Sequence, residues 1–149
     1  MNCGDEVKNM ETHFKPRIIA FCCNWCAYAA ADLAGVSRIQ YPPNVRIIRV
    51  MCSGSVDPLM VIKALHYGAD GVLVLGCHIG DCHYQKGNHL AKKRIAVLQR
   101  LLSYSGIDPR RVKIDWTSAS EGEKFAQIVR EFTEEIRKLG SLSLKEEFS

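Results

Sequence analysis

Short apolar runs alternate with longer amphipathic segments along this chain of 149 residues. The apolar runs have the length and the β-branched content of strands, and the segments between and after them repeat their apolar positions with the period of a helix. The expected strands are 17–21, 45–51, 71–76 and 112–116, and the expected helices are 24–36, 58–67, 90–105 and 121–139. The run at 71–76 is apolar throughout, which is typical of a strand that is covered on both faces.

Local signals mark several helix ends. Asp57 is a good N-cap, Pro58 suits the first helical position, and Gly68 is a typical stop. Ser120 and Glu123 have the spacing of a capping box for the last helix. The apolar periodicity predicts which side chains of the last two helices face the core: Leu90, Ile95, Leu98, Leu101 and Leu102 in one, and Phe125, Ile128, Val129, Phe132 and Ile136 in the other.

The strand and helix order predicts an α/β fold. Four repeats of strand followed by helix favour an open four-stranded parallel sheet with helices on both faces, flavodoxin-like or half-Rossmann, with strand order 2-1-3-4. Residues 1–16 are polar and aperiodic and are expected to be a flexible lead-in, 17–140 form the α/β domain, and 141–149 are a tail.

Composition narrows the class of protein. A hydrophobic fraction of 47% and a charged fraction of 24% are ordinary for a soluble globular domain. The apolar runs are too short to span a membrane, and the charges near the N-terminus argue against a secretion signal, so we expect a cytoplasmic protein without a membrane partner. The net charge of +4 is mild and no nucleic-acid-binding module is recognisable, so nucleic acid is not an expected partner.

Seven cysteines change this picture, because clustered thiols in a reducing compartment usually bind metal or perform redox chemistry. Five of them should converge. Cys23, Cys52 and Cys77 follow three different strands, Cys26 lies one helical turn after Cys23, and Cys82 lies in a glycine-rich loop. The carboxyl ends of parallel strands form the edge where α/β sheets bind ligands.

The other two cysteines are interpreted differently. Cys22 should point away from Cys23 and act as a small buried apolar residue, and Cys3 belongs to the lead-in. The spacing of the remaining five leaves zinc and an iron–sulfur cluster both open, and the glycines favour a cluster because backbone N–H groups can approach it closely.

A dithiol redox site at the "CNWC" motif is an alternative, although it leaves Cys52, Cys77 and Cys82 without a role. His78, His83 and His89 are expected to support the site or lie on the surface. Trp25, Tyr84 and Trp116 are candidates for shielding it, with core packing as the equal alternative.

The segments "CNWCAYAAADLAGVSRIQYPPNVRIIRVMCSGSVDP", "GADGVLVLGCHIGDCHYQKGN" and "EGEKFAQIVREFTEEIRKLG" resemble the iron–sulfur delta subunit of methyl-viologen-reducing hydrogenase from methanogenic archaea. The resemblance covers about residues 17–140. It implies a small electron-transfer subunit that carries one 2Fe-2S cluster, held by four of Cys23, Cys26, Cys52, Cys77 and Cys82.

The resemblance also implies the partners. Electrons would pass from the large and small subunits of a nickel-iron hydrogenase to this protein, then to the flavin-containing A subunit of heterodisulfide reductase and through it to the B and C subunits. The flavin would bifurcate electron pairs, and this chain would contribute no substrate-converting active site of its own. A CxxC dithiol redox protein and a structural zinc-binding adaptor remain the alternative functions.

Overall fold

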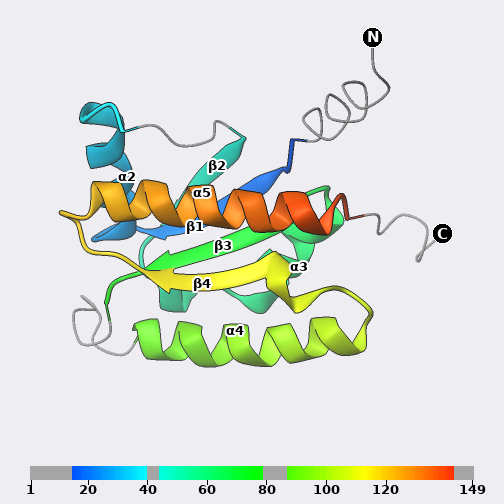
Figure 1. Cartoon of the computed structure of the whole chain (residues 1–149). Helices are drawn as coiled ribbons and strands as arrows, with labels where there is room; N and C mark the ends of the chain where they lie inside the picture. The colour runs from blue at the N-terminus through cyan, green and yellow to red at the C-terminus, as the bar shows by residue number, and fades with distance from the viewer. Residues whose placement is uncertain (1–14, 40–43, 79–86, 143–149) are drawn as a thin grey trace, which may run out of the picture.

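A computed structural model describes residues 15–39, 44–78 and 87–142. Four strands form one parallel sheet in the order β2-β1-β3-β4 (Figure 1). They are β1 (Ile18–Cys23), β2 (Val45–Val50), β3 (Gly71–Gly76) and β4 (Val112–Trp116). Ile18 pairs with Val45 on one side and with Gly71 on the other, so the strand ends are aligned across the sheet. The predicted fold class and strand order are confirmed.

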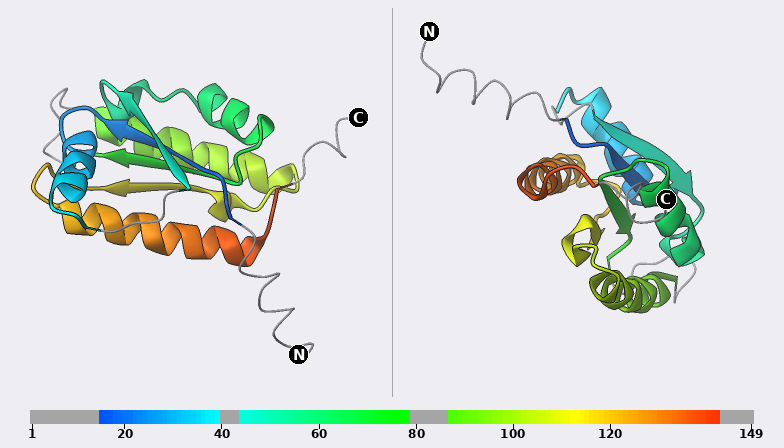
Figure 2. Two further views of the ribbon diagram at one scale, coloured as in Figure 1. Left: turned by 90° about the horizontal axis from the view of Figure 1, so that it is seen from above. Right: turned by 90° about the vertical axis from the view of Figure 1, so that its right-hand side faces the viewer.

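Within the described ranges, four α-helices cover the sheet in two layers (Figure 2). Helices α2 (Ala27–Val36) and α5 (Gly122–Leu139) lie on one face, and α3 (Pro58–His66) and α4 (Gly87–Tyr104) lie on the other. Two short 3-10 helices, η1 (Ser53–Ser55) and η2 (Pro109–Arg111), precede α3 and β4. Each face has its own apolar core, because side chains alternate between the two faces along a strand.

The two long helices differ in how they meet the core. All five inward positions predicted for α5 are buried, which confirms that prediction. In α4, Ile95, Leu98 and Leu102 are buried as predicted, but Leu90 is 43% exposed and Leu101 is 57% exposed. The prediction for these two leucines is therefore wrong. The covered stripe of α4 is narrow, repeating at Ala91, Ile95, Leu98 and Leu102, and Leu90 and Leu101 fall just outside it.

Helix ends follow the sequence signals in one case and depart from them in another. The Asp57 side chain accepts the backbone N–H of Leu59 at 2.9 Å, with Pro58 in the first turn, and Gly68 ends the helix region at a φ of +115°. The capping box predicted for α5 is wrong. Glu121 is the N-cap residue of α5 and no side chain makes a cap hydrogen bond there, since the Glu121 carboxylate contacts His78 and the backbone N–H of Ser118 instead.

The first strand is longer and the first helix shorter than predicted. Strand β1 continues through Cys22 and Cys23, and α2 begins only at Ala27, with Cys26 as its N-cap residue. Two of the candidate ligands therefore sit on either side of a tight strand-to-helix turn. None of the helices in the described part of the chain has the length and apolar character needed to cross a membrane.

Candidate thiol site at the carboxyl edge of the sheet

The centre of the site is a contact between two buried thiols from neighbouring strands. Cys23 ends β1 and Cys77 follows β3, and their Sγ atoms are 3.4 Å apart. Both side chains are almost fully buried. The contact follows from the topology, because β1 and β3 are parallel neighbours and their carboxyl ends meet at the same edge.

Two further thiols lie in the same core. Cys26, half-buried at the start of α2, hydrogen-bonds the Cys77 side chain. Cys52 follows β2, and its Sγ accepts the backbone N–H of Gly54 at 3.4 Å. All four thiols belong to the cluster of apolar residues under α2 and α5. The structure thus joins Cys23 and Cys26 to Cys77 and places Cys52 in the same core, and Cys82 lies outside the described residues. Their role as ligands stays a prediction.

Burial favours the protonated form of the Cys77 thiol. Burial raises the pKa of the Cys77 thiol well above its ordinary value, and the hydrogen bonds with Cys26 and Cys23 raise it further. Cys77 is therefore a neutral thiol at pH 7 in the protein alone. A coordinating metal reverses this preference, because the bound thiol loses its proton outright.

Cys22 belongs to the same core as Cys23, so the prediction that it points away from Cys23 is not confirmed; the thiol contact with Cys77, however, is made by Cys23. Cys22 is fully buried in the α2–α5 core, as predicted for a small apolar side chain. Burial raises the pKa of Cys22 to about 12, with a further contribution from the charge of Cys23. The neighbouring pair Cys22 and Cys23 thus offers an internal control for any test of the site.

Glycines allow the backbone to close around the site. A Cβ on Gly76 would lie 2.6 Å from Ser53 Oγ and 2.9 Å from Ser53 Cβ, so the end of β3 packs directly on η1. A Cβ on Gly54 would lie 2.7 Å from the backbone of Gly87, at the start of α4. The segment after β2 is therefore packed closely against the end of β3 and the start of α4.

Two polar residues that support the site were not found by sequence reasoning. Asn88 is fully buried and donates to the carbonyl oxygens of Cys77, at 3.1 Å, and His78, at 2.9 Å. Glu121 accepts from the backbone N–H of Ser118 and lies 2.5 Å from Nε2 of His78, and this pairing with His78 holds the Glu121 pKa at about 2. In the sequence, Asn88 stands just before the apolar positions of a predicted helix, and that pattern suggests a helix cap. The structure instead shows Asn88 as a donor to carbonyl groups 10 and 11 residues earlier in the chain.

The aromatic and histidine predictions have mixed outcomes. His78 does contact a neighbouring polar residue, in line with a supporting role, and His89 is exposed. Trp25 is 42% exposed beside Cys26, and Trp116 is half-buried next to Gly76. Shielding by these two tryptophans stays a prediction, and His83 and Tyr84 lie outside the described residues.

The donor chemistry of the site fits an iron–sulfur cluster. Among the described residues, which do not include Cys82, no group of three or more His, Cys, Asp or Glu side chains is arranged to hold one metal ion. A 2Fe-2S cluster takes four protein ligands, two on each iron. Adjacent thiols such as Cys23 and Cys77 suit that requirement, and soft thiolate donors are the ligands that iron–sulfur clusters take.

Fold and site together define a parallel α/β protein with a buried group of thiols at the ligand-binding edge of its sheet. Comparison with known proteins then identifies the family: the chain belongs to the family described as methyl-viologen-reducing hydrogenase, delta subunit, whose model matches residues 18–140.

Individual relatives agree with this assignment. The chain is 52% identical over 131 residues to the iron-sulfur D subunit of the F420-non-reducing hydrogenase of Archaeoglobus profundus, covering 88% of this chain and 96% of the relative. It is 50% identical over 137 residues to the vhc iron-sulfur D subunit of Methanococcus voltae, covering 92% and 95%. It is also 49% identical over 136 residues to the A subunit of the ferredoxin:CoB-CoM heterodisulfide reductase of Methanosarcina mazei, covering 90% of this chain but 17% of that longer protein.

Proposed function

We propose that this chain is an electron-transfer subunit that carries one 2Fe-2S cluster at the carboxyl edge of its sheet. The observation that carries the proposal is the contact between the Cys23 and Cys77 thiols, with Cys26 and Cys52 in the same buried core. Relatives that match over nearly their whole length are called iron-sulfur subunits, which supports the same assignment.

Four of the five candidate cysteines would hold the cluster. Cys23, Cys52 and Cys77 come from three different strand ends and are the first three ligands in this proposal. The fourth ligand is either Cys26 or Cys82. Each of them lies near another candidate along the chain, so the one that is not a ligand is the spare thiol of the five. Cys26 has the contact with Cys77 in its favour.

When bound, the cluster would take up and release one electron at a time. The protein's own part is to exclude water and to place polar groups. The apolar core under α2 and α5 surrounds the thiols, and the backbone N–H of Gly54 points at the sulfur of Cys52, where it would stabilise negative charge. Asn88 fixes the backbone that carries Cys77.

The relay would run between two larger proteins. Relatives of this chain are named as subunits of a hydrogenase, and in Methanosarcina a protein named as the A subunit of heterodisulfide reductase contains a matching segment. We therefore place the chain between the large and small hydrogenase subunits, which would be its donors, and the reductase A subunit, which would be its acceptor. Onward transfer to the B and C subunits and bifurcation at the flavin of the reductase follow from the family resemblance, as does a cytoplasmic location.

The two alternative functions make different demands on the site. A dithiol redox site would use Cys23 and Cys26 alone, yet the Cys23 thiol contacts Cys77, which lies outside the CxxC motif. The thiol contact therefore favours the cluster over the dithiol site. A structural zinc adaptor would use four donors around one ion, and metal analysis separates it from the cluster.

Metal analysis of the anaerobically purified full-length chain tests the cofactor. About two irons and two sulfides per chain, with an EPR signal after dithionite reduction, are expected for one 2Fe-2S cluster. One zinc and no sulfide per chain would contradict the cluster and support the structural zinc adaptor. Absence of both metal and sulfide would support the dithiol redox site.

A second experiment tests the relay separately from the cofactor. Hydrogen and the hydrogenase subunits should reduce the cluster of the intact chain, and adding the reductase A subunit should reoxidise it. Without the hydrogenase subunits, hydrogen should leave the cluster oxidised. Reduction by hydrogen in the isolated chain would contradict a pure relay, because it would require an active site of its own.

A further inference from the structure

The amino-terminal half of the edge strand β2 is open on the face toward α3. Val45 and Ile47 pack into the core under α2, so the alternating residues Arg46 and Ile48 face the α3 side. There Ile48 is 41% exposed and Arg46 is exposed. Of β2, Val50 packs into the core with Val61 and Leu65 of α3, whereas Arg46 and Ile48, nearer the amino end of the strand, line a hollow beside α3.

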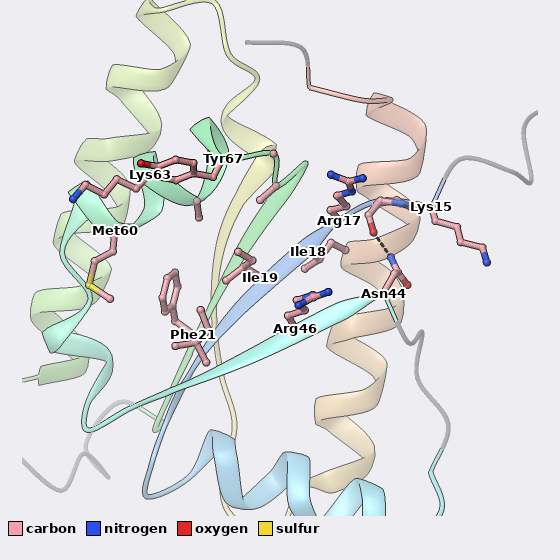
Figure 3. A pocket seen from close by; sticks show the side chains of 15 residues that line it. Lys15, Arg17, Ile18, Ile19, Phe21, Asn44, Arg46, Met60, Lys63 and Tyr67 are labelled. Atoms are coloured by element: carbon pink, nitrogen blue, oxygen red, sulfur yellow. Dashed lines mark hydrogen bonds between the residues drawn. The ribbon is translucent and has the colours of Figure 1, made fainter. Parts of the chain in front are cut away.

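This hollow is a groove with an apolar floor. Ile19 and Phe21 of β1 form the floor next to Ile48, and Met60 and Tyr67 of the α3 region form one wall (Figure 3). The hollow has a volume of about 850 Å³. Because it runs beside α3 in the helical layer, it lies where a further helix of that layer would pack.

The rim of the groove is strongly basic. Lys15, Arg17, Arg46 and Lys63 line it, and all four side chains are exposed. The lining residues include no Asp or Glu, and none of the ion pairs found in the described part of the chain involves these four cations. Figure 3 shows Lys63 on the α3 side and Arg17 and Arg46 on the strand side, so positive charge flanks the apolar floor from both sides.

We propose that this groove docks an acidic amphipathic helix of a partner protein. Its apolar face would cover Ile19, Phe21 and Ile48, and its carboxylates would meet the four cations. This is the helix-in-groove mode of recognition, with charge complementarity setting the orientation. The groove lies toward the amino ends of the strands and the thiols lie at their carboxyl ends, so the partner anchors the chain and leaves the thiol edge free.

Site-specific crosslinking of the full chain in its own cells tests the occupant. A photoreactive phenylalanine analogue replaces Ile48, and the same analogue replaces Val36, which is 83% exposed on α2, as the control. Mass spectrometry of the Ile48 crosslinks should identify one segment of another protein that is acidic and has helical apolar spacing, and the Val36 variant should not capture that segment. Crosslinks to this chain's own termini, to a second copy of it, or to no protein at all would overturn the proposal.

Charge reversal then tests the basic rim with a synthetic peptide of the crosslinked segment. The double variant Arg46→Glu with Lys63→Glu should weaken peptide binding about tenfold or more at low salt, and less at high salt. The control, Lys92→Glu with Arg100→Glu on α4, makes the same change in net charge on exposed side chains outside the groove and should change binding less than about twofold.

Circular dichroism verifies that both variants are folded, and Arg46→Gln with Lys63→Gln provides a milder pair in case reversal disturbs the fold. Equal weakening by the groove and control variants would overturn the proposal. Iron content of the groove variants should match that of the unmodified chain, so a failure here is distinguishable from a failure of the relay proposal.

Discussion

The two ends of the sheet differ in how tightly they are built. At the carboxyl edge, thiols from three strand ends are buried, glycines bring backbones into contact, and a buried asparagine holds the loop after β3. At the amino edge, a groove of about 850 Å³ is open and rimmed by cations. Under the two proposals above, the closely packed edge would hold the cluster in a fixed position, and the open edge would meet the partner.

The largest expected effect concerns close packing at the carboxyl edge. Gly76→Ala would drive a Cβ into Ser53 and should lower the free energy of unfolding by about 2–3 kcal/mol. Gly35→Ala is the control, since a Cβ there meets nothing within 4 Å, and it should raise stability by up to about 1 kcal/mol because alanine favours the helix. Urea unfolding of both variants measures the difference, and equal effects would contradict tight packing at Gly76.

Replacing one asparagine at each edge compares how much a side-chain hydrogen bond contributes to stability at the two edges. Asn88→Ala leaves the carbonyl groups of Cys77 and His78 without their donor in a buried place and should cost about 2 kcal/mol of stability. Asn44→Ala at the amino edge removes a half-buried bond to the carbonyl of Pro16 and should cost about 1 kcal/mol or less, because water replaces the donor. Urea midpoints that rank the two variants in the opposite order would contradict the claim that the carboxyl edge is the more tightly built one.

Groove residues should contribute little to folding. Arg46→Ala and Ile48→Ala each remove an exposed side chain from the edge strand and should change the free energy of unfolding by no more than about 0.5 kcal/mol. Thermal and urea unfolding of the full chain measure this. A loss well above that value would mean that these side chains serve the fold, which would weaken the case for a docking surface.

The smallest effect is expected from an ion pair near the amino end of β4. Arg110 holds the pKa of Asp108 at about 2, below the ordinary value of about 3.9. The carboxylate therefore adds stability at pH values above its unfolded pKa, and this contribution is lost as the pH falls toward 2. Asp108→Asn should be slightly less stable than the unmodified chain at pH 7 because the pair is exposed, and the gap should close by about pH 2. Urea unfolding at several pH values measures the gap.

Sequence reasoning predicted the carboxyl edge better than the surfaces around it. The order of strands follows from right-handed crossovers, and residues that come directly after parallel strands must meet at one edge. Cys23, Cys52 and Cys77 do lie at the carboxyl ends of three strands, as their positions predicted, and their role as ligands stays a prediction. Cys22 was also predicted correctly to be buried, but strand alternation does not separate it from its neighbour, since both side chains belong to the core under α2 and α5.

Features that depend on packing between distant segments were not predicted. Periodicity identified a helix at α4, but how much of its apolar face is covered depends on where the neighbouring strands end, so Leu90 and Leu101 were assigned to the core wrongly. The capping box at Ser120 failed because Glu121 pairs with His78, which is 43 residues away in the sequence. Asn88 was missed for the same reason, since both of its acceptors belong to the loop after β3.

Replacing two adjacent cysteines one at a time tests the central proposal most directly. Cys23→Ser and Cys22→Ser are purified anaerobically as full chains, and iron, sulfide and the EPR signal of the reduced protein are measured for both. Cys23→Ser should lose the cluster signal and most of its iron and sulfide, because Cys23 makes the thiol contact with Cys77 on which the proposal rests. Cys22→Ser should retain about two irons per chain, because Cys22 is not one of the proposed ligands. Equal retention of the cluster in both variants, or its loss in Cys22→Ser alone, would contradict the assignment of Cys23 as a ligand and with it the proposed site.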